Sequence, residues 1–340
     1  MSTTRIFPIY TFFWECTLRC NLECRHCGSD CLKRSESHDM PFADIEPVLR
    51  SIRAHQPGTR CVVHTIGGEP LVRKDLPECG RKITEMGFLW GTVSNAMLLD
   101  GPMMRELSKS GLRSLAVDLD GLRPEHDWLR RQPGSFDKVF DAIAHIRRAP
   151  HLTWDVITCV NPRNIDSLPE LKRLLTEAGV QQWRCFAIAP MGRAKDELGL
   201  QLSADQVRQL MEFIVETRHE GKINLSFSCE GYLGDYEKRV RSYGYNCQAG
   251  ISCASVRENG DISGCLSIRS HYTQGNIYQD DFWDVWVNRF VPFRTFDWRR
   301  NGDCRDCDVF LKCKGGPMHL RDDEGTLMLC NYQRLFKQNI

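Results

Sequence analysis

Five cysteines crowd into one short stretch near the start of the chain, CTLRCNLECRHCGSDC, at residues 16–31. Clustered thiols can form disulfides, hold zinc or bind an iron–sulfur cluster. The chain has 17 cysteines in 340 residues, whereas a secreted disulfide scaffold would be short. Two further groups lie at 247–265 and 304–330. In a long chain, this clustering indicates metal ligands.

The spacing within the first group selects three of its cysteines. Cys20, Cys24 and Cys27 form a C-x3-C-x2-C pattern, and three thiolates can hold three corners of a [4Fe–4S] cluster and leave the fourth iron open. Zinc prefers four ligands in paired spacings. The pattern therefore favours a cluster with an open iron, with a zinc knuckle as the alternative. We interpret Cys16 and Cys31 as structural.

Composition and the N-terminus restrict the class of protein. The net charge is +1, and 41% of residues are hydrophobic, so nothing indicates a nucleic acid or an acidic membrane as partner. No signal peptide is recognisable, and no apolar run approaches the ~20 residues of a membrane helix. We expect a cytoplasmic protein with neither a nucleic-acid nor a membrane partner.

Short strand-like runs alternate with amphipathic helical repeats through the first two thirds of the chain. The expected strands are 9–15, 61–66, 88–95, 114–120, 152–160 and 183–190. Apolar spacing predicts helices between them, with Ser135 as one N-cap and a Ser203/Gln206 capping box before another. This alternation predicts an α/β fold, a partial (β/α)6 barrel, with chemistry at the carboxyl ends of its strands.

The composition of the sequence changes near residue 230, where the helical periodicity of apolar residues weakens and Gly, Asn, Asp and Cys become frequent. We expect a partial barrel at residues 1–229 and a smaller cysteine-rich domain, held by metal, at residues 230–340.

The segment CNLECRHC, residues 20–27, resembles the cluster-binding motif of radical S-adenosylmethionine (radical SAM) enzymes. The resemblance implies that the open iron chelates the amino and carboxylate groups of SAM. One electron then cleaves SAM to methionine and a 5′-deoxyadenosyl radical, which takes a hydrogen atom from the substrate. His26 stands where the family usually has an aromatic residue beside the adenine.

The GGEP turn, residues 67–70, ends the second expected strand and resembles a SAM-binding motif of this family. The resemblance implies that Gly67 and Gly68 let the backbone approach the SAM amino group, with Glu69 in support. An ammonium needs acceptors, and glycine removes the steric barrier. A simple turn is the alternative.

Later strand ends carry further positions of the same resemblance. Asn95 lies in a Ser-Asn-Ala turn similar to the family's Thr-Asn-Gly turn, with Ala96 in place of glycine. Asp118 stands where relatives commonly have a serine near the ribose, and a plain turn residue is the alternative. Arg130, in HDWLRRQPGSF, is the implied partner of the SAM carboxylate. Arg131 is the second choice, and a solvated surface arginine is the alternative.

The C-terminal cysteines resemble the SPASM domain, the auxiliary-cluster extension of radical SAM enzymes that modify peptides and proteins. The resemblance implies that Cys304, Cys307, Cys313 and Cys330 complete one auxiliary [4Fe–4S] cluster, with structural zinc as the alternative. The other auxiliary cluster has Cys247, Cys253 and Cys265 as its ligands.

The usual fourth ligand of that cluster falls at Pro317, and proline cannot bind iron. Either this cluster has one open iron, or another residue supplies the fourth ligand, or the site is empty. Cys229 and His319 are the candidate substitute ligands. The implied cofactors are thus SAM, its [4Fe–4S] cluster and one or two auxiliary clusters.

The resemblance implies an oxidoreductase or maturase that works anaerobically on a peptide or protein side chain, with a ferredoxin- or flavodoxin-type reductant. Alternatives are a radical dehydrogenase of a small molecule and a non-enzymatic iron–sulfur or zinc protein.

Sulfatase maturation is disfavoured because Leu266 stands where that activity has an acidic base. We expect no additional N-terminal domain that binds a leader peptide. Residues 229–241 and 318–321 resemble a bacterial subgroup encoded beside lipoproteins. No catalytic residue is assigned.

Overall fold

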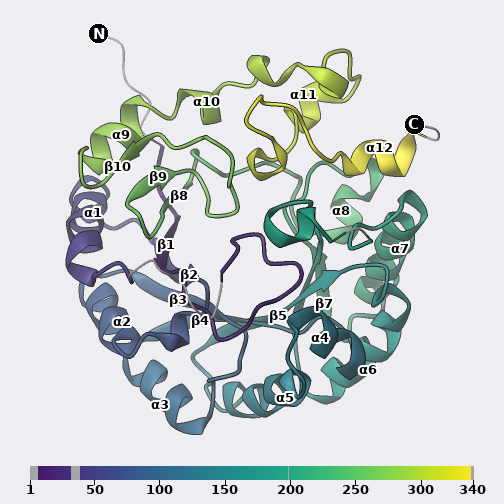
Figure 1. Cartoon of the computed structure of the whole chain (residues 1–340), viewed down its shortest axis with the longest axis horizontal. Helices are drawn as coiled ribbons and strands as arrows, with labels where there is room; N and C mark the ends of the chain where they lie inside the picture. Colours follow the sequence, from purple (N-terminus) through teal and green to yellow (C-terminus); the bar gives the residue numbers. More distant parts are fainter. Residues whose placement is uncertain (1–6, 32–38, 198, 338–340) are drawn as a thin grey trace.

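The computed structural model describes residues 7–31, 39–197 and 199–337. Its centre is one curved sheet with strand order β10-β9-β8-β1-β2-β3-β4-β5-β6-β7. Helices surround this sheet, and the C-terminal segments complete the ring on the side away from β3 and β4 (Figure 1). The expected α/β fold with a parallel barrel-type sheet is confirmed.

The parallel strands correspond closely to the expected ones. They are β1 Thr11–Thr17, β2 Val62–Gly67, β3 Leu89–Ser94, β4 Leu112–Asp118, β5 Thr153–Val160, β6 Gln182–Ala187 and β7 Asn224–Phe227. The sequence did not predict β7, because its four residues, NLSF, are too short to show a period.

The helices that follow these strands are α1 Phe42–His55, α2 Leu76–Glu85, α3 Gly101–Lys109, α4 Arg123–Arg130, α5 Ser135–Ile146, α6 Leu168–Glu177 and α7 Ala204–Glu220. Most of them form a ring around the sheet, while α4 lies inside that ring (Figure 1). The expected capping box of Ser203 and Gln206 begins α7.

The expected N-cap at Ser135 is wrong by one residue. Gly134 occupies that position, and the Asp127 carboxylate replaces the usual cap side chain. Its oxygens accept hydrogen bonds from the backbone N–H of Gly134 at 2.7 Å and of Phe136 at 2.9 Å. The Ser135 hydroxyl also donates to Asp127, at 2.8 Å.

The C-terminal region continues the same sheet. β8, Cys253–Val256, pairs in parallel with β1, while β9, Asp261–Ser263, and β10, Gly275–Asn276, add antiparallel strands. The short helix α8, Glu237–Val240, precedes β8, and four more follow β10: α9 Phe282–Asn288, α10 Val291–Arg294, α11 Phe310–Cys313 and α12 Asn331–Phe336. α9 packs on α1 and α12 on α7. The domain boundary at 229/230 stays a prediction.

Within the described residues, no helix combines the length and the apolar character needed to cross a membrane.

Candidate active site

The cysteine loop after β1 lies over the mouth of the barrel (Figure 1). Its first residues are fixed by the β2 turn, since Gly68 N–H donates to Thr17 O at 2.8 Å and Glu69 N–H to Arg19 O at 2.9 Å. A Cβ on Gly67 would lie 2.0 Å from Thr17 O, and one on Gly68 would lie 2.2 Å from Arg19 O. Gly67 also has a φ of 138°. Glycine is therefore required here so that the β2 turn can pack against the cysteine loop.

The far end of the loop is fixed by Arg193, which follows β6. Its Nε donates to Cys24 O at 2.8 Å and its Nη1 to Cys31 O at 3.0 Å. Its backbone N–H donates to Cys27 O at 3.0 Å. The Arg193 guanidinium and backbone thus hold the cysteine loop in place.

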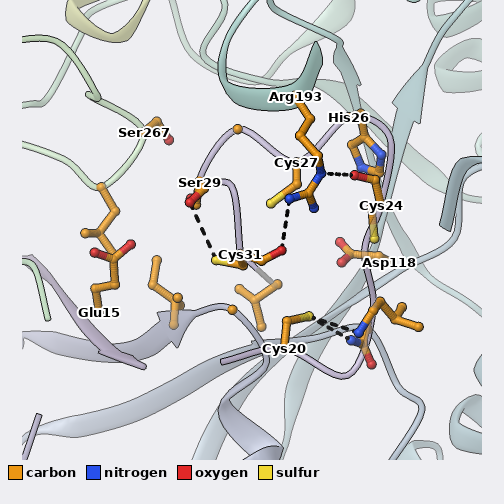
Figure 2. A pocket seen from close by; sticks show the side chains of 18 of the residues that line it. Glu15, Cys20, Cys24, His26, Cys27, Ser29, Cys31, Asp118, Arg193 and Ser267 are labelled. Atoms are coloured by element: carbon orange, nitrogen blue, oxygen red, sulfur yellow. Dashed lines mark hydrogen bonds between the residues drawn. The ribbon is translucent and has the colours of Figure 1, made fainter. Parts of the chain in front are cut away.

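These anchors leave a cavity of about 340 Å³ under the loop. Figure 2 shows the Cys20, Cys24 and Cys27 thiols around a common space. All but one of the residues expected around the SAM-binding cluster line this cavity: Cys20, Cys24, His26, Cys27, Gly67, Gly68, Asn95, Asp118 and Arg130.

The exception is Glu69, which is 1% exposed and lies behind the wall. Its carboxylate accepts hydrogen bonds from Asn95 N–H at 2.7 Å and Ser94 Oγ at 2.9 Å. Burial raises the pKa of Glu69 to about 7, although these hydrogen bonds oppose the shift. Glu69 thus joins the ends of β2 and β3 and positions Asn95 on the cavity wall.

Arg130 is held by two carboxylates at the end of β4. Its Nε and Nη2 both lie 2.6 Å from Asp120 Oδ2, and its Nη1 lies 3.2 Å from Asp118 Oδ2. Nη1 also lies 3.8 Å from Cys24 Sγ. Burial raises the pKa of Asp118 to about 6, and the Arg130 charge opposes that rise. Arg131 lies outside the cavity and pairs with Glu197 at 2.8 Å.

His26 lies beside Asp120 and Cys159, with ligand-type atoms of the three residues within 4.8 Å of one another. Burial lowers the pKa of His26 to about 4, so the imidazole is neutral at pH 7. Its Nδ1 is buried and has no hydrogen-bond partner among the described residues. A neutral, planar ring that lines the cavity suits a planar ligand.

The three thiols fit an iron–sulfur cluster as a donor set. Burial raises the pKa of Cys20 to about 12 and also raises that of Cys24. A hydrogen bond with Cys31 lowers the pKa of Cys27 to about 5. Iron binding removes the proton from each thiol. Soft thiolates around one cavity, with Arg130 beside Cys24, are what a [4Fe–4S] cluster needs.

The opposite wall contains polar groups that the sequence analysis did not select. Glu15, within β1, is 0% exposed, and its Oε1 accepts a hydrogen bond from Arg269 Nη2 at 2.6 Å. Arg269 also donates to Ser29 Oγ. Figure 2 shows Glu15 and Ser267 across the cavity from Cys24 and Asp118. A glutamate inside an aromatic strand was the available sequence signal, because unpaired burial of a charge is costly.

The four cysteines of the complete auxiliary set surround one small apolar hollow: Cys304, Cys307, Cys313 and Cys330. Arg321 Nη2 lies 3.7 Å from Cys304 Sγ and brings a positive charge to that set. Cys247, Cys253 and Cys265 interact with one another. The charge of Cys265 adds to the burial that raises the pKa of Cys247, and Cys265 and Cys247 both contribute to the raised pKa of Cys253. A hydrogen bond with Cys253 lowers the pKa of Cys265 to about 7.

Comparisons with known proteins agree with this geometry. Residues 14–175 match the radical SAM superfamily, and residues 247–308 match SPASM, an iron–sulfur cluster-binding domain. The AdoMet-dependent heme synthase of Methanosarcina barkeri is 26% identical over 319 residues, 89% of this chain and 89% of the synthase. The mycofactocin maturase MftC of Mycobacterium tuberculosis is 28% identical over 313 residues, 90% of this chain and 77% of the maturase.

The fold is also that of a solved structure. Streptococcus suis SuiB bound to S-adenosylmethionine superposes with a TM-score of 0.71 at 19% identity, over 94% of this chain and 76% of SuiB. The chain therefore contains a radical SAM domain followed by a SPASM domain. Its cofactors are SAM and [4Fe–4S] clusters.

Proposed function

We propose that this enzyme abstracts a hydrogen atom from a peptide or protein side chain that enters the cavity beside Glu15 and Arg269. The observation that carries the proposal is the two-sided cavity. Three cysteine thiols and Asp118 line one wall, and a buried Glu15–Arg269 ion pair lines the other. One wall suits a cluster and a nucleotide, and the other suits a polar substrate.

Each residue of the first wall has a separate task in this proposal. Cys20, Cys24 and Cys27 hold the cluster, whose open iron and bound SAM supply a carbon-centred radical after one-electron reduction. The backbone at Gly67 and Gly68 accepts from the SAM ammonium. Asp118 accepts from the ribose hydroxyls.

Arg130 has a supporting task. Its guanidinium is already shared between Asp118 and Asp120, so it keeps Asp118 ionised and in place. We therefore assign Arg130 a positioning role, and direct pairing with the SAM carboxylate is secondary to it.

The second wall positions the substrate. Arg269 uses Nη2 for both Glu15 and Ser29, which leaves its other nitrogens to face the cavity that it lines. A guanidinium held in this way suits a carboxylate or a peptide carbonyl. The resemblance to the maturase MftC supports a peptide substrate.

A second candidate is a small carboxylate-bearing substrate, as in a radical reaction on a tetrapyrrole. The AdoMet-dependent heme synthase relative, which matches over 89% of both chains, favours this candidate. Arg269 would then bind a carboxylate of the small molecule. A ferredoxin- or flavodoxin-type protein is the proposed electron donor in both cases.

Anaerobic reconstitution tests the proposal. With SAM and dithionite, the wild type should form 5′-deoxyadenosine, and Cys24→Ala should form none while keeping its auxiliary iron. Candidate peptides and iron tetrapyrroles are then added separately, and mass spectrometry looks for modification. Turnover of a tetrapyrrole with no modified peptide would replace the peptide proposal by the small-molecule one. Absence of 5′-deoxyadenosine from wild type with full iron content would contradict both.

A further inference from the structure

The first auxiliary set has only three cysteines at the positions of the SPASM pattern, because Pro317 stands at the fourth. A cluster with three protein ligands would leave one iron open to solvent or substrate. The identity of the fourth ligand therefore decides whether this cluster binds substrate or only transfers electrons.

Cys229 lies at the opposite edge of the curved sheet from the other members of this set. It lies two residues after the end of β7, the last strand in the sheet order. Cys253 begins β8, and Cys265 lies two residues after the end of β9, beyond β1 on the other side. Figure 1 shows that the ring of the barrel is completed between β7 and β8 by C-terminal segments rather than by strand pairing.

The chain after Cys229 packs against Pro317 itself. A Cβ built on Gly231 would lie 3.7 Å from Pro317 Cδ. On the other side of that proline, the Met318 N–H donates to the Cys247 thiol. The residue that cannot bind iron is thus flanked by Cys247 and by the segment that starts with Cys229.

The pKa shifts agree with this arrangement. Desolvation by the surrounding protein raises the pKa of Cys229 to about 12, and the charges of Cys265 and Cys247 add to the rise. The charge of Cys229 likewise contributes to the raised pKa of Cys253, after the effects of Cys265, burial and Cys247. For His319, burial is the cause of a pKa lowered to about 4.

The backbone around Cys229 is firmly held. Ser228 N–H donates to Cys185 O at 3.0 Å, and the Glu230 carboxylate accepts from Ala187 N–H at 2.8 Å. Asn331 Nδ2 donates to Glu230 O at 2.8 Å. A metal ligand needs such support, because a fixed sulfur position lowers the entropy lost on binding.

We propose that Cys229 is the fourth ligand of the auxiliary cluster whose other ligands are Cys247, Cys253 and Cys265. The cluster then joins β7 to β8 and β9 and closes the open side of the barrel. Four thiolates leave no iron for substrate, so this cluster transfers electrons between the active site and a reductant. The inference rests on the SPASM domain and is independent of the proposed substrate.

Iron content and spectroscopy of the reconstituted full-length protein test this assignment. Both Cys229→Ala and the matched control His319→Gln are made in wild type and in a Cys20→Ala/Cys24→Ala/Cys27→Ala background, which lacks the SAM-binding cluster. We expect Cys229→Ala to lose one of the four irons of this cluster and to show the EPR signal of an oxidised three-iron cluster, or to lose the cluster entirely. His319→Gln should keep both its iron content and its spectrum.

Thiol alkylation of the unmutated protein provides a test that needs no variant. The Cys229 side chain reaches solvent in the described structure, so iodoacetamide should modify it in iron-free protein, at a slow rate because its raised pKa leaves little thiolate. In reconstituted protein we expect modification at least tenfold slower than in iron-free protein, parallel to Cys247. Alkylation of Cys229 in fully loaded protein at the iron-free rate, or a spectral change in His319→Gln with none in Cys229→Ala, would overturn the assignment.

These measurements test the ligation by Cys229 separately from the proposed enzymatic function. Iron loss in Cys229→Ala is measurable even if no substrate is found. Formation of 5′-deoxyadenosine by the wild type is likewise measurable if Cys229 proves not to be a ligand.

Discussion

Glu15 and Arg269 form an ion pair of 2.6 Å although 254 positions separate them in the chain. Glu15 lies within β1, two residues before its end, and Arg269 follows β9 in the cysteine-rich region. The Glu15 side chain is 0% exposed, and that of Arg269 is 24% exposed. The pair therefore connects the barrel to the C-terminal region at the wall where the substrate is proposed to enter.

Removal of one partner of the Glu15–Arg269 ion pair should destabilise the fold. We expect Arg269→Met to lower the free energy of unfolding by about 3 kcal/mol, because Glu15 is left as an unpaired buried charge. Glu15→Gln/Arg269→Met should recover most of that stability. Both variants should still cleave SAM, while formation of modified substrate falls at least tenfold. Denaturant melts and the ratio of product to 5′-deoxyadenosine provide the measurements. Full product formation by the double variant would remove Arg269 from the substrate site.

The β2 turn offers a second prediction. In Gly68→Ala the new methyl group would lie 2.2 Å from Arg19 O, one residue before Cys20. The cysteine loop must shift, so we expect Gly68→Ala to bind less iron at the SAM cluster and to form at least tenfold less 5′-deoxyadenosine. Gly244→Ala is the matched control, because nothing lies within 4 Å of its Cβ position. Normal iron content and activity in Gly68→Ala would show that the loop tolerates the displacement.

The sequence predicted the barrel well because its strands and helices have strong local periods. Ile45, Val48, Leu49 and Ile52 are all buried on α1, as their spacing indicated. The cysteine spacing likewise indicated the three thiols that line the cavity. Short β7 and the pairing of β8 with β1 lacked such a signal, because strand pairing across the whole chain leaves no local pattern.

The roles of charged residues were harder to predict than their presence near the site. The resemblance selected Arg130 as a site residue. Its ion pairs with Asp118 and Asp120 could not be predicted, because they depend on three-dimensional distances. Glu69 belonged to the expected motif, yet its carboxylate braces β3 and does not line the cavity. Arg269 had no motif at all, because its partner comes from the other end of the chain.

Ala96 offers a third prediction, which concerns stability. This residue has a φ of 66°, a left-handed conformation that glycine adopts without steric cost. We expect Ala96→Gly to raise the free energy of unfolding by about 1 kcal/mol. The control Ala142→Gly, inside α5, should lower it by about 1 kcal/mol. Thermal and denaturant melts of iron-free protein measure both values. A loss of stability in Ala96→Gly would mean that the alanine methyl group makes contacts that outweigh the strain.

The last prediction concerns the pH dependence of SAM binding. Burial raises the pKa of Asp118 to about 6, with the Arg130 charge opposing the rise. The carboxylate accepts hydrogen bonds fully only when ionised, so SAM affinity should fall as pH decreases through about 6. Arg130→Met removes the opposing charge, and the midpoint should move to higher pH, with at least tenfold weaker binding at pH 7.

The variant Asp118→Asn is the control for this titration. It should bind SAM weakly, with no dependence on pH around 6, because its amide does not ionise. Equilibrium binding of SAM to anaerobically reconstituted protein between pH 5 and 8 provides the measurement, with iron content checked at each pH. A wild-type midpoint that stays in place in both variants would show that another group titrates, and Asp118 would then have no role in holding the nucleotide.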